Sequence, residues 1–197
     1  MNCSQDREPL ETTLALIHTR QQTSTKRLGE PGPDAAQIET ILGAASAAPD
    51  HGRITPWRLV IVPQQRRHLL AEAFAAALLE RDSTAAEYQL QEARDKAYRG
   101  PLLVMVIARL APALGKAHPQ ERIISAGCAI QNMLLTAHAM GFGAGLSSGR
   151  ALYSQPLRRL FQLSEDEQPL CFVAVGTVTR GKPIDIRPKL ADYTSTL

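Results

Sequence analysis

Apolar residues near the start of the chain recur at the spacing of an α-helix. Leu10, Leu14 and Ile17 fall close to one face of such a helix, and a polar, basic segment follows Thr19. That segment has no apolar period and therefore no face to bury. We expect a first helix that ends near Thr19.

A second helical pattern follows Asp34, a residue type that often caps the N-terminus of a helix. Ile38, Ile41 and Leu42 recur behind it at helical spacing. Pro49 should end this helix, because the residue before a proline disfavours helical geometry. The segment that follows then connects a helix to a strand.

Three segments are near-continuous runs of apolar, largely β-branched residues: 57–62, 102–108 and 170–178. Strands that are covered on both faces lose the alternation of apolar and polar positions, so these runs predict the strands of a central sheet. Between the first two runs, residues 66–81 and 85–98 have the amphipathic pattern of surface helices.

Residues 119–140 are apolar on nearly every side of a predicted helix. One small sheet covers only part of such a helix, and a subunit interface is an economical source of further cover. The pattern therefore predicts a buried helix and a homodimer. Gly141 is expected to follow the end of this helix as its C′ residue.

Glycine is concentrated directly after that helix, in the segment GFGAGLSSG at 141–149. Gly143, Gly145 and Gly149 allow the backbone to come close to another group. A bound ligand and a tight packing contact both account for this pattern.

Length, composition and charge limit the classes of protein. A chain of 197 residues with 44% hydrophobic residues can bury one substantial core and hardly two, so we expect a single domain over residues 1–197. The net charge of +3 comes from scattered Lys and Arg, without the dense basic run typical of nucleic-acid or membrane-surface partners. Three distant cysteines indicate neither a disulfide framework nor a zinc site.

The chain has no feature of a targeting or membrane segment. The amino terminus lacks the cationic and apolar regions of a signal peptide, and no uncharged apolar run reaches the ~20 residues that span a bilayer. We expect a soluble, cytoplasmic protein.

Three stretches together carry a family resemblance: TRQQTSTKRLGEPGP at 19–33, AAPDHGRITPW at 47–57 and SAGCAIQNMLLTAHAMGFGAGLSSG at 125–149. In this order and spacing they resemble the nitroreductase family of FMN-dependent oxidoreductases. The resemblance implies an α+β fold with a central, mostly antiparallel sheet flanked by helices, and an intertwined homodimer. It also implies two FMN sites at the dimer interface, each built from both chains.

The first stretch maps the family's Arg-Arg-Ser motif, which holds the FMN phosphate and ribityl chain, onto Arg20, Gln21 and Gln22. Arg20 offers the planar, charged fork that suits a phosphate, whereas the two glutamines carry no charge. Other cations could restore the positive field near that phosphate: Lys26, Arg27, Lys182 and Arg187.

The second stretch maps two flavin contacts of the family onto Ala47 and His51. The resemblance implies that His51 reaches a flavin bound mainly by the partner subunit, where its imidazole can donate to a flavin or ribityl oxygen. Spacing alone favours a loop histidine that caps a backbone carbonyl. Arg53 would lie at the rim as an anion contact, and Trp57 is expected in the core because it opens an apolar strand.

The third stretch maps the family's flavin-facing residues onto Leu146, Ser147 and Ser148. Backbone N–H groups and hydroxyls there can hydrogen-bond the isoalloxazine edge, which favours the reduced flavin. Family members often carry a bulky side chain or an arginine at Leu146 and Ser147, so the residues of this chain imply a roomier pocket.

The resemblance also implies a ping-pong reaction. NAD(P)H passes a hydride to the flavin and leaves, and an electron-poor acceptor, a nitroaromatic or a quinone, then takes its place. Hydride transfer needs no protein acid or base, and the sequence has no convincing nucleophile–base or paired-carboxylate arrangement.

Two alternatives stay open from the sequence. The first is a flavin-binding or interaction protein of the same fold without NAD(P)H turnover, which the uncharged Gln21 and Gln22 favour. The second is a dehydrogenase without flavin. The chain has no Gly-x-Gly-x-x-Gly fingerprint, which weighs against a tight dinucleotide site of that kind.

Overall fold

An antiparallel sheet forms the centre of the protein. The computed structural model describes residues 7–112, 116–181 and 186–197. Within them the strands follow the order β1-β5-β3-β2, and β4 also pairs with β5. Every ladder between these strands is antiparallel. The strands are β1 (Leu28–Gly29), β2 (Trp57–Ile61), β3 (Leu102–Arg109), β4 (Gly143–Ser147) and β5 (Glu167–Val178).

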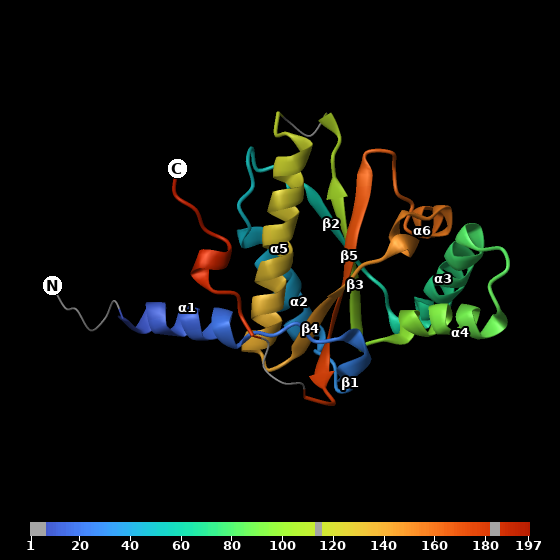
Figure 1. Cartoon of the computed structure of the whole chain (residues 1–197), viewed down its shortest axis with the longest axis horizontal. Coiled ribbons are helices and arrows are strands. Elements are labelled where there is room, and N and C mark those ends of the chain that lie inside the picture. Colours follow the sequence, from blue (N-terminus) through green and yellow to red (C-terminus); the bar gives the residue numbers. More distant parts are fainter. Residues whose placement is uncertain (1–6, 113–115, 182–185) are drawn as a thin grey trace.

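Helices cover both faces of this sheet (Figure 1). The α-helices are α1 (Arg7–Thr19), α2 (Ala35–Gly43), α3 (Arg67–Arg81), α4 (Glu87–Asp95), α5 (Pro119–Ala139) and α6 (Gln155–Leu160). One core cluster joins α2 and α5 to one face, and a second joins α3 and α6 to the other. Figure 1 also shows α1 projecting away from the rest of the fold. The observed α+β architecture confirms the predicted fold class.

The central strand β3 confirms the prediction of strands covered on both faces. Val104 and Val106 pack in the cluster with α5, whereas Met105 and Ile107 pack in the cluster with α3. All four of these side chains are fully buried. Because successive side chains of a strand point to opposite faces, burial on both faces requires the unbroken apolar run seen in the sequence.

The predicted helix boundaries are confirmed at several caps. The first helix ends at Thr19, as expected. Asp34 accepts a hydrogen bond from the backbone N–H of Gln37, and the Gln37 side chain returns one to the backbone of Asp34. Gly141 has φ of +83°, the left-handed geometry of a C′ residue. Trp57 is buried in the core, also as predicted.

Other elements differ from the sequence-based expectation. The strands β1 and β4 and the helix α6 were not predicted, because β1 is very short and β4 is rich in glycine. The strand β2 lies at an end of the described strand order, which leaves Ile61 43% exposed instead of covered on both faces. In the single chain α5 is buried on one side only, and Ile124 on its outer side is 65% exposed.

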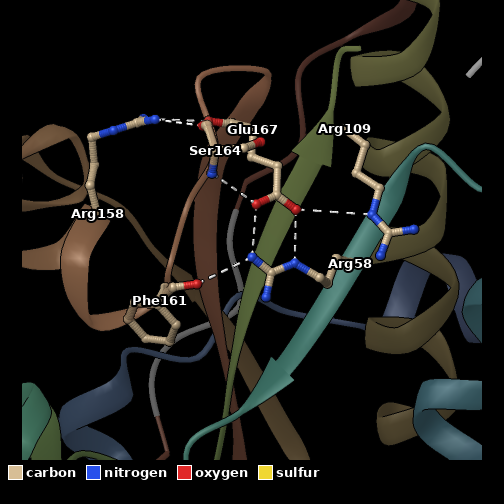
Figure 2. A network of polar contacts seen from close by, with 6 residues as sticks. All are labelled: Arg58, Arg109, Arg158, Phe161, Ser164 and Glu167. Carbon is tan, nitrogen blue, oxygen red and sulfur yellow. Dashed lines mark hydrogen bonds and ion pairs between the residues drawn. The ribbon is translucent and has the colours of Figure 1, made fainter. Parts of the chain in front are cut away.

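A charged network joins the strands at the end of the sheet where β5 begins (Figure 2). Two nitrogens of Arg58 donate to the two carboxylate oxygens of Glu167 at 2.8 and 2.9 Å, and Arg109 lies 4.0 Å from the same carboxylate. Arg158 of α6 donates to the carbonyl oxygens of Ser164 and Glu167. The hydrogen bond from Arg58 holds the pKa of Glu167 below its usual range. The network fixes the connection between α6 and β5.

Candidate functional site

An open cavity of about 440 Å³ lies on the face of the sheet that α3 and α4 cover. Its volume falls in the range of small-molecule and cofactor sites, ~300–1,000 Å³. Side chains of the core, among them Phe74, Leu103 and Phe172, form its apolar wall. The end of β4 and the helical turn that follows it, Arg150–Tyr153, form the opposite wall.

The predicted flavin-facing stretch forms part of this cavity. Ser147 and Ser148 line it, together with Thr25 and Gly149. Leu146 does not, and its side chain is 39% exposed. The structure therefore brings two of the three predicted residues of this stretch to one wall.

Gly145 shows why β4 is rich in glycine. A Cβ atom on Gly145 would lie 1.9 Å from the carbonyl oxygen of Thr23, and one on Gly143 would lie 2.5 Å from Val178. At Gly149, by contrast, nothing lies within 4 Å of an added Cβ. Of the two explanations left open by the sequence, a tight packing contact applies to Gly143 and Gly145.

The segment predicted to hold the FMN phosphate runs beside β4. The backbone N–H of Thr23 donates to the carbonyl oxygen of Ala144 at 3.0 Å, and Gln22 forms a parallel bridge with Ala144. The Gln22 side-chain amide donates to the carbonyl oxygen of Leu146 at 3.1 Å. This amide group thus holds the first motif against the third, a role that the sequence did not indicate.

The charged end of the first motif contacts the carboxy-terminal segment. The guanidinium of Arg187 donates to the carbonyl oxygen of Arg20, so two arginines far apart in sequence lie side by side. Arg27 donates to the carbonyl oxygen of Gly181 at 3.4 Å. Lys26 is exposed, and Lys182 lies outside the described residues. Of the four candidate cations, Arg187 is the one in the described part of the chain that contacts Arg20.

Cationic residues that the sequence analysis did not single out surround the cavity. Arg81 ends α3, Lys96 and Arg99 lie between α4 and β3, and Arg150 follows β4. No linear motif joins them, because they come from separate elements that only the fold brings together. Glu92 is the single acidic residue among the described residues of the lining.

A buried arginine fixes the wall that carries Lys96 and Arg99. The Arg67 side chain has no exposed surface, and its guanidinium donates to the carbonyl oxygens of Val62, Ala97, Gly100 and Pro101 at 2.8, 2.6, 3.3 and 3.0 Å. Burial lowers the pKa of Arg67 from its usual value. These bonds satisfy carbonyl groups that no strand or helix pairs, so Arg67 joins the start of α3 to the turn before β3.

The second predicted motif lies elsewhere in the single chain. Ala47 and His51 are exposed, and neither lines the cavity. The Nδ1 atom of His51 lies 3.4 Å from a carboxylate oxygen of Glu121, in the first turn of α5. Because α5 covers the other face of the sheet, the predicted site residues form two separate groups within one chain.

The described part of the chain shows neither a reactive buried cysteine at position 171 nor a cluster of metal ligands. Burial raises the pKa of the Cys171 thiol to about 12, so this cysteine is not a nucleophile near neutral pH. Among the residues at 7–112, 116–181 and 186–197, His, Cys, Asp and Glu form no group that could hold a metal ion. No helix of this part is long and apolar enough to cross a membrane.

Comparisons with known proteins agree on one family. The profile of the Nitroreductase family matches residues 19–177. A "Putative NAD(P)H nitroreductase" of Haemophilus influenzae is 34% identical over 164 residues, which cover 83% of this chain and 87% of that protein. A nitroreductase-like family protein from Bacillus cereus superposes with a TM-score of 0.79 at 16% identity, over 93% and 95% of the two chains. The FMN-dependent nitroreductase NfnB from Mycobacterium smegmatis, solved in complex with NADPH, gives 0.72 at 17% identity, over 96% and 100%.

Proposed function

The chain belongs to the nitroreductase family of flavin-using oxidoreductases, and we propose that it binds FMN as a homodimer and passes electrons from NAD(P)H to an electron-poor acceptor. The observation that carries this proposal is the cavity. Residues mapped independently to the flavin, Ser147 and Ser148, line a space of cofactor size that also gathers cations.

The lining of the cavity fits an isoalloxazine ring. The side chains of Phe74, Leu103 and Phe172 offer apolar contact, and the hydroxyls of Ser147 and Ser148 offer hydrogen bonds. The bound flavin supplies hydride acceptance and donation. A cation near the ring, Lys96 or Arg99, would stabilise the negative charge that reduction brings.

Arg20 and Arg187 fit the phosphate of FMN. The Arg187 guanidinium donates to the backbone carbonyl of Arg20, so both residues belong to one segment of the surface, and a charged fork binds phosphate well. Gln21 and Gln22 carry no charge, so the charged contact with the phosphate depends on Arg20 and Arg187.

The outer side of α5 supports the homodimer. Ile124 is 65% exposed there, and burying such a side chain against a second chain stabilises the pair by roughly 1.5–3 kcal/mol. Ala47 and His51 lie beside the same helix, away from the cavity of their own chain. In the proposed dimer His51 serves the flavin of the partner subunit.

The residues of this chain then act by binding and orientation. Arg67 holds the turn with Lys96 and Arg99, and the contact between Gln22 and Leu146 holds the end of β4. Hydride transfer itself moves no proton, so it needs no protein acid or base. The hydride donor and the acceptor use the same open face in turn. Protons reach the acceptor from solvent through the open side of the cavity.

A comparison of two flavins tests the proposed binding mode. Arg20→Ala should weaken FMN binding by roughly 1.5–3 kcal/mol, the value of a charge-assisted hydrogen bond, and should weaken riboflavin binding much less. Arg159→Ala on the exposed side of α6 removes the same charge far from the proposed phosphate site and serves as the control. Equal losses of FMN and riboflavin affinity in Arg20→Ala would contradict the assignment.

A further inference from the structure

The cations around the cavity lack the ion pairs that some other arginines of the protein form. Arg58 and Arg94 form ion pairs with glutamates at 2.8 Å. Arg81, Lys96, Arg99 and Arg150 form no ion pair within 4.0 Å with any carboxylate that the structure describes. Hydrogen bonds from Thr84 lower the pKa of Asp82 and the nearby charge of Arg81 adds a little to this, but Arg81 and Asp82 form no ion pair.

Several like charges around one concave space raise the positive potential inside it. Low-dielectric walls focus this potential, so anions concentrate in the cavity and neutral molecules do not. Glu92 offsets only part of the charge, since it is the one acidic residue among the described lining residues. The charges are thus arranged for a negatively charged ligand.

The four cations divide into two groups by position. Lys96 and Arg99 lie on the wall that Arg67 fixes; Arg99 is half-buried and Lys96 is exposed. Arg81 and Arg150 are exposed and lie on other elements, at the end of α3 and directly after β4. If the flavin ring takes Lys96 and Arg99, Arg81 and Arg150 remain available to a second molecule.

We propose, on the basis of the proposed function, that the acceptors of this enzyme are electron-poor aromatic acids whose carboxylate or sulfonate Arg81 and Arg150 bind. The open flavin face takes the ring, and the exposed guanidinium groups take the acid group. For a nitro acid the step is R–NO2 + H⁻ + H⁺ → R–NO + H2O. The hydride comes from NAD(P)H by way of the flavin, and the proton comes from solvent.

The phosphates of NAD(P)H are the other anions that could meet Arg81 and Arg150. The two half-reactions of a ping-pong cycle separate these cases. Anaerobic enzyme is reduced with light and EDTA, which needs no nicotinamide, and is then mixed with acceptor. The rate of flavin reoxidation then reports on the acceptor alone.

The test compares 4-nitrobenzoate with 4-nitrobenzamide, which have nearly the same shape and differ by one charge. The second-order rate of reoxidation is measured for each, and their ratio is compared among Arg81→Gln, Arg150→Gln, the double variant and wild type. Arg159→Gln removes one exposed arginine outside the cavity and is the matched control. Positions 81, 150 and 159 are all exposed, so we expect these variants to fold as wild type does.

The proposal predicts that the benzoate-to-benzamide ratio falls about tenfold in the double variant and stays at the wild-type value in Arg159→Gln. Added salt should lower the wild-type ratio, because it screens the exposed guanidinium groups. An unchanged ratio in the double variant overturns the proposal while the proposed function stands. If the variants slow flavin reduction by NADPH and leave the benzoate-to-benzamide ratio unchanged, Arg81 and Arg150 bind the nucleotide. That result also overturns the proposal. Reoxidation by neither acceptor would contradict the proposed function itself.

Discussion

The cavity wall and the loop that carries His51 are built in opposite ways. The wall is held by buried groups: Arg67 bonds four carbonyl oxygens, and Gly145 packs directly on the backbone of Thr23. The loop is exposed, and Gly52, Arg53 and Thr55 have positive φ. The wall is thus held by contacts within one chain, whereas the loop has few such contacts, among them the pair of His51 with Glu121; in the proposed dimer the loop gains further contacts from the second chain.

This difference predicts that changes in the two regions have different effects on the stability of the fold and on flavin binding. Changes in the cavity wall should lower both the stability of the fold and its affinity for flavin. Changes in the loop should affect flavin binding with little effect on the fold, because an exposed side chain contributes little to the core.

The largest effect is expected at Arg67. Arg67→Met leaves four buried carbonyl groups without a donor and should destabilise the fold by about 4 kcal/mol. FMN affinity should fall as well, because the turn with Lys96 and Arg99 loses its anchor. Denaturant unfolding and flavin titration measure the two effects.

Arg122 provides the matched control for this prediction. It is also buried, and it donates to the carbonyl oxygen of Ala117 at the start of α5, away from the cavity. Arg122→Met should destabilise the fold and leave the FMN affinity of the remaining folded protein nearly unchanged. If both variants lose FMN affinity equally, Arg67 has no special relation to the cavity.

Gly145 should give the next largest effect. Gly145→Ala places a methyl group against the Thr23 carbonyl oxygen, and the two segments must move apart at a cost of about 3 kcal/mol. Gly149→Ala is the control, because φ there is 172° and nothing lies within 4 Å of the new atom. Thermal melting of both variants should show a clear loss for Gly145→Ala only.

Glu167 should show a dependence on pH. Its folded pKa is lowered, so the stability it adds is present above the pKa of the unfolded chain and is lost as the pH falls through the folded pKa. Glu167→Gln should therefore cost about 2 kcal/mol at pH 7 and progressively less below about pH 4. Unfolding free energies measured at several pH values test this; a constant difference at every pH would assign the loss to packing.

His51 should have the smallest effect on the fold and a selective effect on flavin. Its imidazole is exposed, and its one polar partner among the described residues is Glu121 at 3.4 Å, so His51→Ala should change the melting temperature of flavin-free protein very little. In the proposed dimer the variant gains less stabilisation from saturating FMN than wild type does. Equal FMN-induced shifts in both proteins would rule out the cross-dimer contact.

The sequence predicted the elements that depend on local pattern. The helix end at Thr19, the cap at Asp34 and the buried strand β3 all follow from periodicity and capping. The strand β4 was not predicted. Close packing against other segments requires glycine at 143 and 145, and a local sequence pattern does not show such long-range contacts. The α+β fold class followed from the family resemblance.

The candidate site was predictable only in part. Ser147 and Ser148 were found through the family motif, and both line the cavity. Arg67, Lys96 and Arg150 were missed, because their roles depend on carbonyl groups and walls that come together only in the folded chain. A buried arginine at the start of an amphipathic helix gives the same sequence signal as an exposed one.

The proposed function requires that the cavity hold a flavin that exchanges electrons with NAD(P)H. The direct test is an anaerobic titration of the purified, FMN-saturated protein with NADH and with NADPH, followed by absorbance at the flavin wavelengths. We expect that at least one nucleotide bleaches the flavin and that an added nitroaromatic or quinone restores its colour. A flavin that binds but is bleached by neither nucleotide would contradict the proposed function and support a flavin-binding protein without turnover.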